Sequence, residues 1–409
     1  MDHLFIARQP IYNRDKSVIG YELLYRNSRV NRANISDGDE ASCITILNSF
    51  MHIGIDNIAG SAYAFINLPR EFIVNKDMTP MFNEQAVLEI LEDIKPDDEV
   101  INGIKRLKDE GYLIALDDFV FQDKLIPLIE LADFIKIDIH ALTKDEVKHQ
   151  FNLLSKYSVK FIAEKVETYE LYQFCYDLGF NYFQGYFFCY PEILQQKSLP
   201  SNKLVILNLL QKIQNPEISS DELELILVQD ITLSYKLLRY INSAAFGLRR
   251  EIDSIKDAII LLGIDNLKNW ISLIMMSKIV ASKPTELIVT GMIRGKMCEK
   301  LAELHHPEVK HQMFIIGLFS VLDAIMDMPL IDLLDTVILS SEVKLALLDY
   351  SGVQGEIYHY VLQYEKSNWD ELLSSSINAE EFIQSYLEAV NWADESMKSL
   401  LNEKTISTS

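Results

Sequence analysis

Several residue types that define whole classes of protein are scarce in this chain of 409 residues. Glycine and proline number only 15 and 11, which excludes collagen-like and low-complexity chains. Cysteine occurs four times without a Cys-x-x-Cys pair, so the sequence predicts neither a zinc cluster nor a disulfide framework and fits a reducing cytoplasm. No apolar run approaches the roughly 20 residues of a membrane-spanning helix, and the N-terminal segment differs from a signal peptide. We therefore expect a cytoplasmic protein without a membrane span.

Positive charge is also scarce. Lysine and arginine number 38 against 60 aspartates and glutamates, which gives a net charge of −22. This charge repels nucleic acid phosphates and anionic lipid at long range, so binding to a nucleic acid polymer is not expected. An anionic ligand would need local cations or bound metal ions. Apolar residues are plentiful at 49%, and the length favours two or three packed domains.

The first half of the chain alternates short apolar runs with helix-like stretches, up to about residue 191. The predicted strands cover residues 18–25, 62–68, 86–91, 113–119, 134–137, 160–163 and 182–183. Repeated alternation of strand and helix indicates a parallel sheet with helical crossovers. Seven or eight such units fit a small α/β fold, a TIM-like (β/α)8 barrel.

The second half carries helical periodicity without alternating strands. The predicted helices cover residues 204–213, 221–228, 233–241, 255–262, 267–279 and 291–304. Ser219 and Glu222 form a capping-box pattern, and Gly263 follows a helix as a stop signal. We expect an all-α domain here, and we divide the chain into domains 1–198 and 199–409.

Oxygen-bearing side chains lie at or near the ends of six predicted strands. They are Glu22, Asn67, Glu89, the pair Asp117 and Asp118, Asp138 and Glu164. In a barrel, the carboxyl ends of the strands converge on the face that carries the active site. One cavity would then hold six carboxylates and an amide. Any one acid taken alone is better explained as a helix N-cap or a solvated ion pair, and only the full set indicates a ligand site.

Six carboxylates in a small cavity require raised pKa values or bound cations. Hard oxygen ligands favour Mg²⁺ or Mn²⁺ over zinc. Two such ions about 3.5 to 4 Å apart, bridged by a carboxylate, hydrolyse phosphodiesters in many enzymes. Lys136 shares a strand face with Asp138 and is a candidate to hold the attacking water or a phosphate, and Arg26 is a candidate for a second phosphate.

These residues resemble the motifs of the EAL domain, the cyclic di-GMP phosphodiesterase domain. The matching segments, in chain order, are Gln9-Pro10-Ile11, Glu22-Leu23-Leu24 with Arg26, Phe65-Ile66-Asn67, Glu89 and Glu92, Asp117-Asp118-Phe119, Lys136-Ile137-Asp138, Ala163-Glu164-Lys165-Val166-Glu167 and Gln184-Gly185-Tyr186. Together they cover about residues 5 to 191.

The resemblance implies the roles of individual residues in opening cyclic di-GMP to linear pGpG with two Mg²⁺ or Mn²⁺ ions. The implied ligands are Glu22, Asn67, Glu89 and Asp117 for the first metal, and Asp117, Asp118 and Glu164 for the second. Glu22, Lys136 and Glu164 are the implied catalytic residues, with Lys136 on the nucleophilic water. The implied contacts to the dinucleotide are Gln9, Arg26, Glu167 and Gln184, to which we add Asp138. The family context implies control of biofilm and motility.

One segment departs from the family pattern. Where the family reads Asp-Asp-Phe-Gly-Thr-Gly-Tyr-Ser-Ser, this chain has Val120 and Gln122 at the glycine positions and continues to Leu125. Without glycine, positive φ angles become costly, so we expect this loop to follow another path. All the implied metal ligands are present, but the loop beside them differs from the family pattern. We expect this difference to affect turnover more than binding.

The helical half resembles the HDOD domain, a module related to the HD hydrolases. The resemblance rests on residues 230–238, 241–247 and 258–263. HD hydrolases need a metal-binding His-Asp dipeptide, which this chain lacks, so metal hydrolysis is not expected in this half. The adjacent pair His305 and His306 points about 100° apart on a helix and is better explained as a surface helix end. Asn242 and Ser243 fit either a helix cap or a groove for a partner.

Three functions remain open at this point. The chain is an active cyclic di-GMP phosphodiesterase, a dinucleotide-binding effector without turnover, or a scaffold that ignores the nucleotide. The intact ligand set speaks against the scaffold, and the altered loop separates the first two. We also expect the helical domain to bind a protein partner, whose identity the sequence does not give. A homodimer is a further alternative.

Overall fold

The computed structural model describes residues 4–27, 55–76, 85–185, 201–215, 217–229, 231–242, 252, 254–279, 283–337 and 339–401. The chain forms two compact units. The barrel unit contains Met1–Phe188 and Ser367–Ile383, and the helical unit contains Cys189–Lys366 and Gln384–Ser409. The predicted boundary at residues 198 and 199 lies outside the described residues and stays a prediction.

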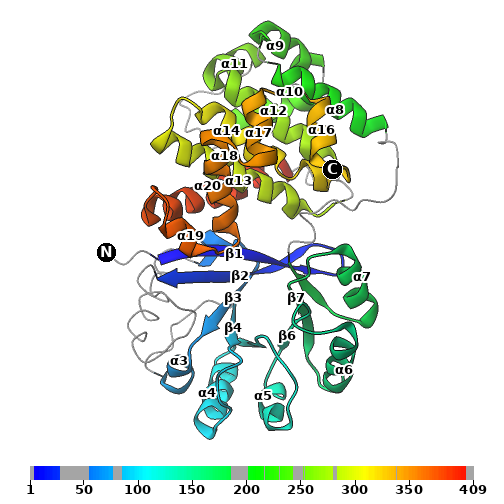
Figure 1. Ribbon diagram of the computed structural model, residues 1–409, viewed down its shortest axis with the longest axis vertical. Helices are drawn as coiled ribbons and strands as arrows, with labels where there is room; N and C mark the ends of the chain where they lie inside the picture. Colours follow the sequence, from blue (N-terminus) through cyan, green and yellow to red (C-terminus); the bar gives the residue numbers. More distant parts are fainter. Residues whose placement is uncertain are drawn as a thin grey trace. The chain divides into compact units, whose positions relative to one another are not determined.

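Eight strands close into a barrel in chain order, which confirms the TIM-like fold class (Figure 1). The strands are β1 (Leu4–Asn13), β2 (Val18–Asn27), β3 (Tyr63–Leu68), β4 (Ala86–Ile90), β5 (Leu113–Leu116), β6 (Phe134–Asp138), β7 (Lys160–Glu164) and β8 (Tyr182–Gln184). Strands β2 to β8 match the seven predicted ones to within a few residues, and each of these neighbours pairs in parallel.

The prediction of an entirely parallel sheet is wrong at β1, a strand that we did not predict. β1 pairs antiparallel with both β2 and β8. A tight turn joins β1 to β2, and the side chain of Asn13 accepts hydrogen bonds from the backbone N–H groups of Asp15 and Ser17. Lys16 in this turn has a φ of 61°. A connection this short joins only antiparallel strands, because a parallel pair needs a crossover.

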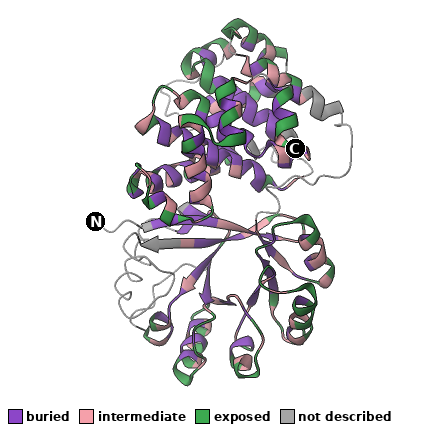
Figure 2. Cartoon of the chain, in the orientation of Figure 1, coloured by how far each residue is buried: buried purple, intermediate pink, exposed green. Residues whose placement is uncertain are grey.

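Helices surround the barrel (Figure 1). They are α2 (Ile55–Ala59), α3 (Arg70–Val74), α4 (Asp98–Asp109), α5 (Ile126–Ile129) with the 3₁₀ helix η2 (Asp123–Leu125) before it, α6 (Lys144–Leu154) and α7 (Tyr169–Leu178). Local sequence sets where they begin: the Asp97 side chain accepts from the Val100 N–H at the start of α4, and Thr143 and Glu146 form a capping box at α6. Most of the described strand residues between them are buried (Figure 2).

The barrel interior is apolar at its base and polar towards the carboxyl ends of the strands. The base consists of side chains that are fully or almost fully buried: Ile11, Phe65, Val87, Ala115, Phe134 and Ile162. Because side chains alternate along a strand, Lys136 and Asp138 follow Phe134 on the inner face of β6. The sequence of β6 therefore places charged groups above an apolar floor.

A short segment from late in the chain belongs to the barrel unit. Helix α19 (Trp369–Leu373) carries Trp369, whose ring stacks on Phe5 of β1 with centroids 5.0 Å apart and an interplanar angle of 17°. Both side chains are buried. The stacking joins the first strand to a residue 364 positions later in the chain.

Every regular element in the described part of the helical unit is a helix, as predicted. Its helices are α8 (Ser201–Gln214), α9 (Ser220–Gln229), α10 (Ile231–Ile241), α11 (Ile255–Leu262), α12 (Ile264–Ile279), α13 (Thr285–His305), α14 (Lys310–Phe319), α15 (Leu322–Met326), α16 (Leu330–Thr336), α17 (Ser341–Asp349), α18 (Gly352–Glu365) and most of α20 (Ala379–Leu401). The Ser219–Glu222 capping box is confirmed by hydrogen bonds in both directions. Gly263, with a φ of 76°, ends α11 as predicted.

Within the described ranges, no single helix is both long and apolar enough to span a membrane, although α11 and Ile264–Ser277 of α12 pass that test as a pair bent by 112°. Cys175 and Cys298 are buried and free, and burial raises the pKa of the Cys175 thiol to about 12. Cys43 and Cys189 lie outside the described residues.

Candidate active site

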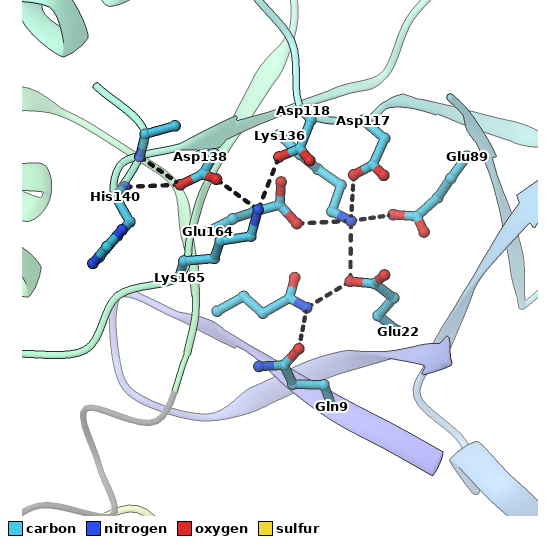
Figure 3. A network of polar contacts seen from close by, with 12 residues as sticks. Gln9, Glu22, Glu89, Asp117, Asp118, Lys136, Asp138, His140, Glu164 and Lys165 are labelled. Atoms are coloured by element: carbon cyan, nitrogen blue, oxygen red, sulfur yellow. Dashed lines mark hydrogen bonds and ion pairs between the residues drawn. The ribbon is translucent and has the colours of Figure 1, made fainter. Parts of the chain in front are cut away.

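The charged centre of the barrel is Lys136, whose side chain is fully buried. Four carboxylate oxygens surround its Nζ atom: Glu89 Oε1, Asp117 Oδ1 and Glu164 Oε1 at 2.8 Å each, and Glu22 Oε2 at 3.1 Å (Figure 3). We call these four acids the carboxylate cluster. They come from β2, β4 and β7 and from the residue that follows β5, so residues far apart in sequence meet around one ammonium group.

Strand register brings these residues to one level of the barrel. Gln9 lies opposite Glu22, Asn67 lies opposite Glu89, and Asp138 lies opposite Glu164. The parallel strands end at the same edge, which is the edge that carries active sites in this fold.

The electrostatics of the cluster are dominated by burial. Burial raises the pKa of Glu89 well above its usual value and raises the pKa of Glu164 to about 8, against the opposing effect of Lys136. Burial alone would lower the pKa of Lys136, but the surrounding carboxylates raise that pKa well above the ordinary value. One ammonium group cannot neutralise four buried carboxylates. Binding of protons or further cations therefore lowers the free energy of the cluster.

Some oxygens of the cluster lack hydrogen bonds. Glu89 Oε2 and Glu164 Oε2 are buried and have no hydrogen-bond donor among the described residues, and Glu89 Oε1 is near the ammonium without hydrogen-bond geometry. Hard, anionic oxygens of this kind are the donors that Mg²⁺ and Mn²⁺ prefer. With the ammonium at the centre, however, no three His, Cys, Asp or Glu side chains of the described chain are placed to hold a metal ion. The donor chemistry fits a divalent cation, and the ammonium of Lys136 has to move for one to bind.

A second cation lies closer to the mouth of the barrel. Lys165 Nζ donates a hydrogen bond of 2.6 Å to Asp138 Oδ2 and lies 3.5 Å from Asp118 Oδ1 (Figure 3). Asp138 Oδ1 accepts from the backbone N–H groups of His140 and Ala141. Burial would raise the pKa of Asp138, but the bond from Lys165 and these N–H groups lower it, whereas burial and the neighbouring Asp117 raise the pKa of Asp118.

Sequence reasoning did not single out Lys165. The available signal was its position directly after Glu164 at the end of a strand. Lys165 also has a φ of 55°, an uncommon backbone conformation for a side chain with Cβ.

Gln184 connects the cluster to the first strand. Its Nε2 group donates to Glu22 Oε2 at 2.6 Å and to Gln9 Oε1 at 3.0 Å. The side chain of Gln184 is buried. Gln184 therefore holds the Glu22 carboxylate directly, and Gln9 in turn holds the Gln184 amide.

Some predicted site residues lie apart from the cluster or cannot be placed. Glu92 and Glu167 are exposed side chains beyond the ends of β4 and β7. Arg26 belongs to β2, opposite Phe5, but its side chain lies outside the description. Tyr186 also lies outside the described residues.

The altered loop after β5 has an ordered path. Asp118 has a φ of 40°, and no residue from Phe119 to Leu125 has a positive φ. The Phe119 N–H donates to the Lys136 carbonyl at 2.9 Å, and the Phe121 N–H donates to Gln150 Oε1 at 2.8 Å. From Phe119 to Leu125 the loop therefore uses conformations that non-glycine residues adopt without strain, whereas Asp118 has the left-handed conformation that is uncommon for a side chain with Cβ.

The motif positions of the helical unit show structural contacts. Asn242 follows α10, and its side chain donates to the Ile252 carbonyl and accepts from the Ile252 N–H. Ser243 lies outside the described residues. Trp270 to Met276 are buried and belong to the core of the helical unit. His305 ends α13, and His306 Nδ1 lies 3.3 Å from Glu308 Oε1.

Comparison with known proteins gives matches to both halves. Residues 71–191 match the EAL domain and residues 199–330 match the HDOD domain. The cyclic di-GMP phosphodiesterase CdgJ of Vibrio cholerae is 33% identical over 399 residues, which is 96% of this chain and 92% of that protein. The uncharacterized protein YuxH of Bacillus subtilis is also 33% identical, over 95% of this chain and 98% of that protein.

Solved structures of EAL proteins resemble part of the chain. The Bacillus subtilis YkuI protein, with an EAL domain and in complex with cyclic di-GMP and calcium, is 19% identical and has a TM-score of 0.37, covering 64% of this chain and 72% of that one. An EAL domain protein from Listeria monocytogenes is 21% identical with a TM-score of 0.35, covering 46% and 87%.

Proposed function

Because the chain belongs to the family of proteins that join an EAL domain to an HDOD domain, we propose that it is a phosphodiesterase that opens cyclic di-GMP to linear pGpG. The observation that carries the proposal is the carboxylate cluster around Lys136, at the active-site edge of the barrel. The sequence identity of 33% with CdgJ, over nearly the whole length of both chains, supports cyclic di-GMP as the substrate.

Two divalent cations, Mg²⁺ or Mn²⁺, are the proposed cofactors. Glu22, Asn67, Glu89 and Asp117 would hold the first, and Asp117, Asp118 and Glu164 would hold the second. The unsatisfied oxygens of Glu89 and Glu164 support this assignment. Bound cations there supply Lewis acidity and lower the pKa of a bound water. Ca²⁺ has a larger and looser coordination, so we expect it to inhibit.

In the reaction, the oxygen of a water molecule forms a bond to phosphorus while one bond from phosphorus to a 3′ oxygen breaks, and the 3′ oxygen takes a proton. Lys136 Nζ, displaced from the cluster centre, holds the attacking water or a phosphate oxygen. Glu164, whose pKa burial raises to about 8, would carry a proton near neutral pH and would have to lose it to hold a cation. Gln9, Arg26, Asp138, Glu167 and Gln184 bind and orient the dinucleotide.

Incubation of the full chain with cyclic di-GMP and Mn²⁺, followed by chromatography of the products, tests the proposal. We expect pGpG from the wild type and a loss of rate of about 100-fold or more for Glu22→Ala, since a charge-stabilising group at the reacting centre is removed. Glu170→Ala is the matched control, because Glu170 is exposed and pairs with Lys144 on the surface. Equal rates for Glu22→Ala and the wild type would reject the assigned site.

A second candidate is an effector that binds cyclic di-GMP without cutting it and signals through the helical domain to a protein partner. The altered loop and the two ammonium groups among the proposed metal ligands favour this version. Saturable binding of cyclic di-GMP without release of pGpG, in the same incubation, would select it. In either case we propose that the chain acts in the cytoplasm on the second messenger that controls biofilm and motility.

A further inference from the structure

Lys165 carries the accessible ammonium group of the barrel site. Its side chain is 52% exposed, whereas the side chain of Lys136 is fully buried. Among the described side chains, these two ammonium groups contact the four acids of the carboxylate cluster together with Asp118 and Asp138. An anionic ligand at the mouth of the barrel is repelled by these carboxylates, and of the two ammonium groups only that of Lys165 can reach it (Figure 3).

The backbone of Lys165 is held in place on both sides. Before it, the Glu164 carbonyl accepts a hydrogen bond from the Ile139 N–H. After it, the Val166 N–H donates to the Gln184 carbonyl at 2.9 Å. Between these two bonds Lys165 has a φ of 55°, which glycine adopts freely but a residue with Cβ adopts only at a cost. Backbone strain of this kind is concentrated at binding and catalytic sites, so the conformation of Lys165 indicates a function for its side chain.

The two carboxylates that hold the Lys165 ammonium group do so unequally. The bond to Asp138 Oδ2 is short at 2.6 Å, whereas the contact with Asp118 Oδ1 at 3.5 Å is at the upper limit of a hydrogen bond. Lys165 would lose the weaker contact when Asp118 binds a divalent cation, because the cation and the ammonium group repel each other. Asp138 would still hold the ammonium group at the mouth. An ammonium group has three N–H donors, so two of them would then be available to a ligand.

We propose that Lys165 binds a phosphate oxygen of cyclic di-GMP after a divalent cation has displaced it from Asp118. This inference rests on the proposed function of the barrel and adds a residue to the set that binds the dinucleotide. A phosphodiester oxygen is anionic, and a lysine ammonium group binds phosphate as a point charge. The exchange of partners also couples the two ligands, because the cation releases the group that the phosphate uses. By linkage, the dinucleotide then strengthens binding of the cation by the same factor.

Calorimetric titration of the full chain with cyclic di-GMP tests the proposal, with Ca²⁺ in place of Mn²⁺ so that binding is measured without turnover. We expect Lys165→Ala to weaken binding about tenfold, the value of one charge-assisted hydrogen bond at a half-exposed position. Lys165→Arg keeps the positive charge and should bind more tightly than Lys165→Ala. Lys108→Ala is the control, because Lys108 makes an ion pair of 2.7 Å with Asp133, which precedes β6 at the other end of the barrel. Its affinity should equal that of the wild type.

Lys165→Gly separates the ammonium group from the strained backbone. Glycine adopts the φ of 55° freely, so this variant should melt at a higher temperature than Lys165→Ala and yet bind cyclic di-GMP as weakly. Added salt should reduce the difference in affinity between the wild type and both variants, because it screens the charge. If Lys165→Gly binds as tightly as the wild type, the ammonium group does not contact the ligand and the inference is overturned. If the wild type itself does not bind cyclic di-GMP, the proposed function fails as well.

Discussion

The Nζ atom of Lys165 lies 2.6 Å from Oδ2 of Asp138 at the mouth of the barrel, and 3.5 Å from Oδ1 of Asp118. Together with Lys136 in the cluster, this places two ammonium groups among the carboxylates proposed as metal ligands. The two ammonium groups therefore occupy a site that is proposed to bind divalent metal ions. Competition between the ammonium groups and the metal ions can be measured.

Removal of the Lys165 ammonium should strengthen metal binding. We expect Lys165→Ala to bind Mn²⁺ about fivefold more tightly, because a repulsive charge of about 1 kcal/mol at a half-exposed position is lost. Calorimetric titration with Mn²⁺ measures the change. Lys144→Ala is the control, since Lys144 also makes a 2.6 Å ion pair and is similarly exposed. Unchanged or weaker binding in Lys165→Ala would show that Lys165 does not compete.

Replacement of the buried ammonium should destabilise the barrel. Lys136→Met leaves buried carboxylates without a counter-charge, and we expect a loss of about 3 to 5 kcal/mol in the free energy of unfolding. Mn²⁺ should restore more stability to this variant than to the wild type, because binding to the native state stabilises it. The double variant Lys136→Met with Glu89→Gln should recover part of the loss. Urea denaturation with and without Mn²⁺ measures the loss in Lys136→Met, its recovery by Mn²⁺ and its recovery in the double variant. If Lys136→Met is as stable as the wild type, the assigned ion pairs are contradicted.

Stability should depend on pH through Glu164. Its folded pKa of about 8 lies above the ordinary value of 4.5, so between these values the native state binds more protons than the unfolded chain and stability falls as pH rises. Glu164→Gln cannot ionise and should not lose that stability. We expect the variant to melt at a higher temperature than the wild type at pH 8, with a difference that shrinks towards pH 4.5. If the difference in melting temperature instead grows as pH falls, the folded-state pKa of Glu164 lies below its ordinary value, which would contradict the prediction.

Glycines in the loop after β5 should change turnover more than binding. Val120→Gly with Gln122→Gly makes positive φ angles accessible at two positions, at a cost of roughly 0.5 to 1 kcal/mol each in stability. If the loop limits turnover, the variant releases pGpG at least about tenfold faster, which corresponds to about 1.4 kcal/mol in the barrier. Affinity for cyclic di-GMP, measured with Ca²⁺ in place of Mn²⁺, serves as the control and should stay the same. A slower variant would mean that the present loop already supports the reaction.

The contact between Trp369 and Phe5 should contribute to the stability of the barrel unit. Trp369→Ala removes a large, buried, stacked ring, and we expect a loss of about 3 kcal/mol or more. Tyr235→Ala removes an aromatic ring that is 52% exposed and should cost less than about 0.5 kcal/mol. Protease resistance of the barrel unit and urea denaturation report both changes. Equal stability of the two variants would exclude a structural role for the stacking.

The sequence predicted most of the barrel because the parallel strands have short apolar runs, and most of these runs have an acid at or near their end. It did not reveal β1, because an antiparallel strand before a tight turn lacks the crossover helix that marked the others. Lys136 was placed on the correct strand face, yet its contact with four carboxylates depends on barrel closure, which no local pattern contains. Lys165 was missed because a lysine at a strand end is ordinarily a solvated side chain.

The stacking of Trp369 on Phe5 also has a consequence for synthesis on the ribosome. The two residues are separated by 364 positions, which at roughly 5 to 20 residues per second is about 20 to 70 seconds of translation. During that interval the nascent barrel lacks the aromatic cover of its first strand. A fragment that stops near residue 200 never gains the ring of Trp369. Expression of the isolated N-terminal half should therefore give a product that aggregates more readily and depends more on chaperones than the whole polypeptide.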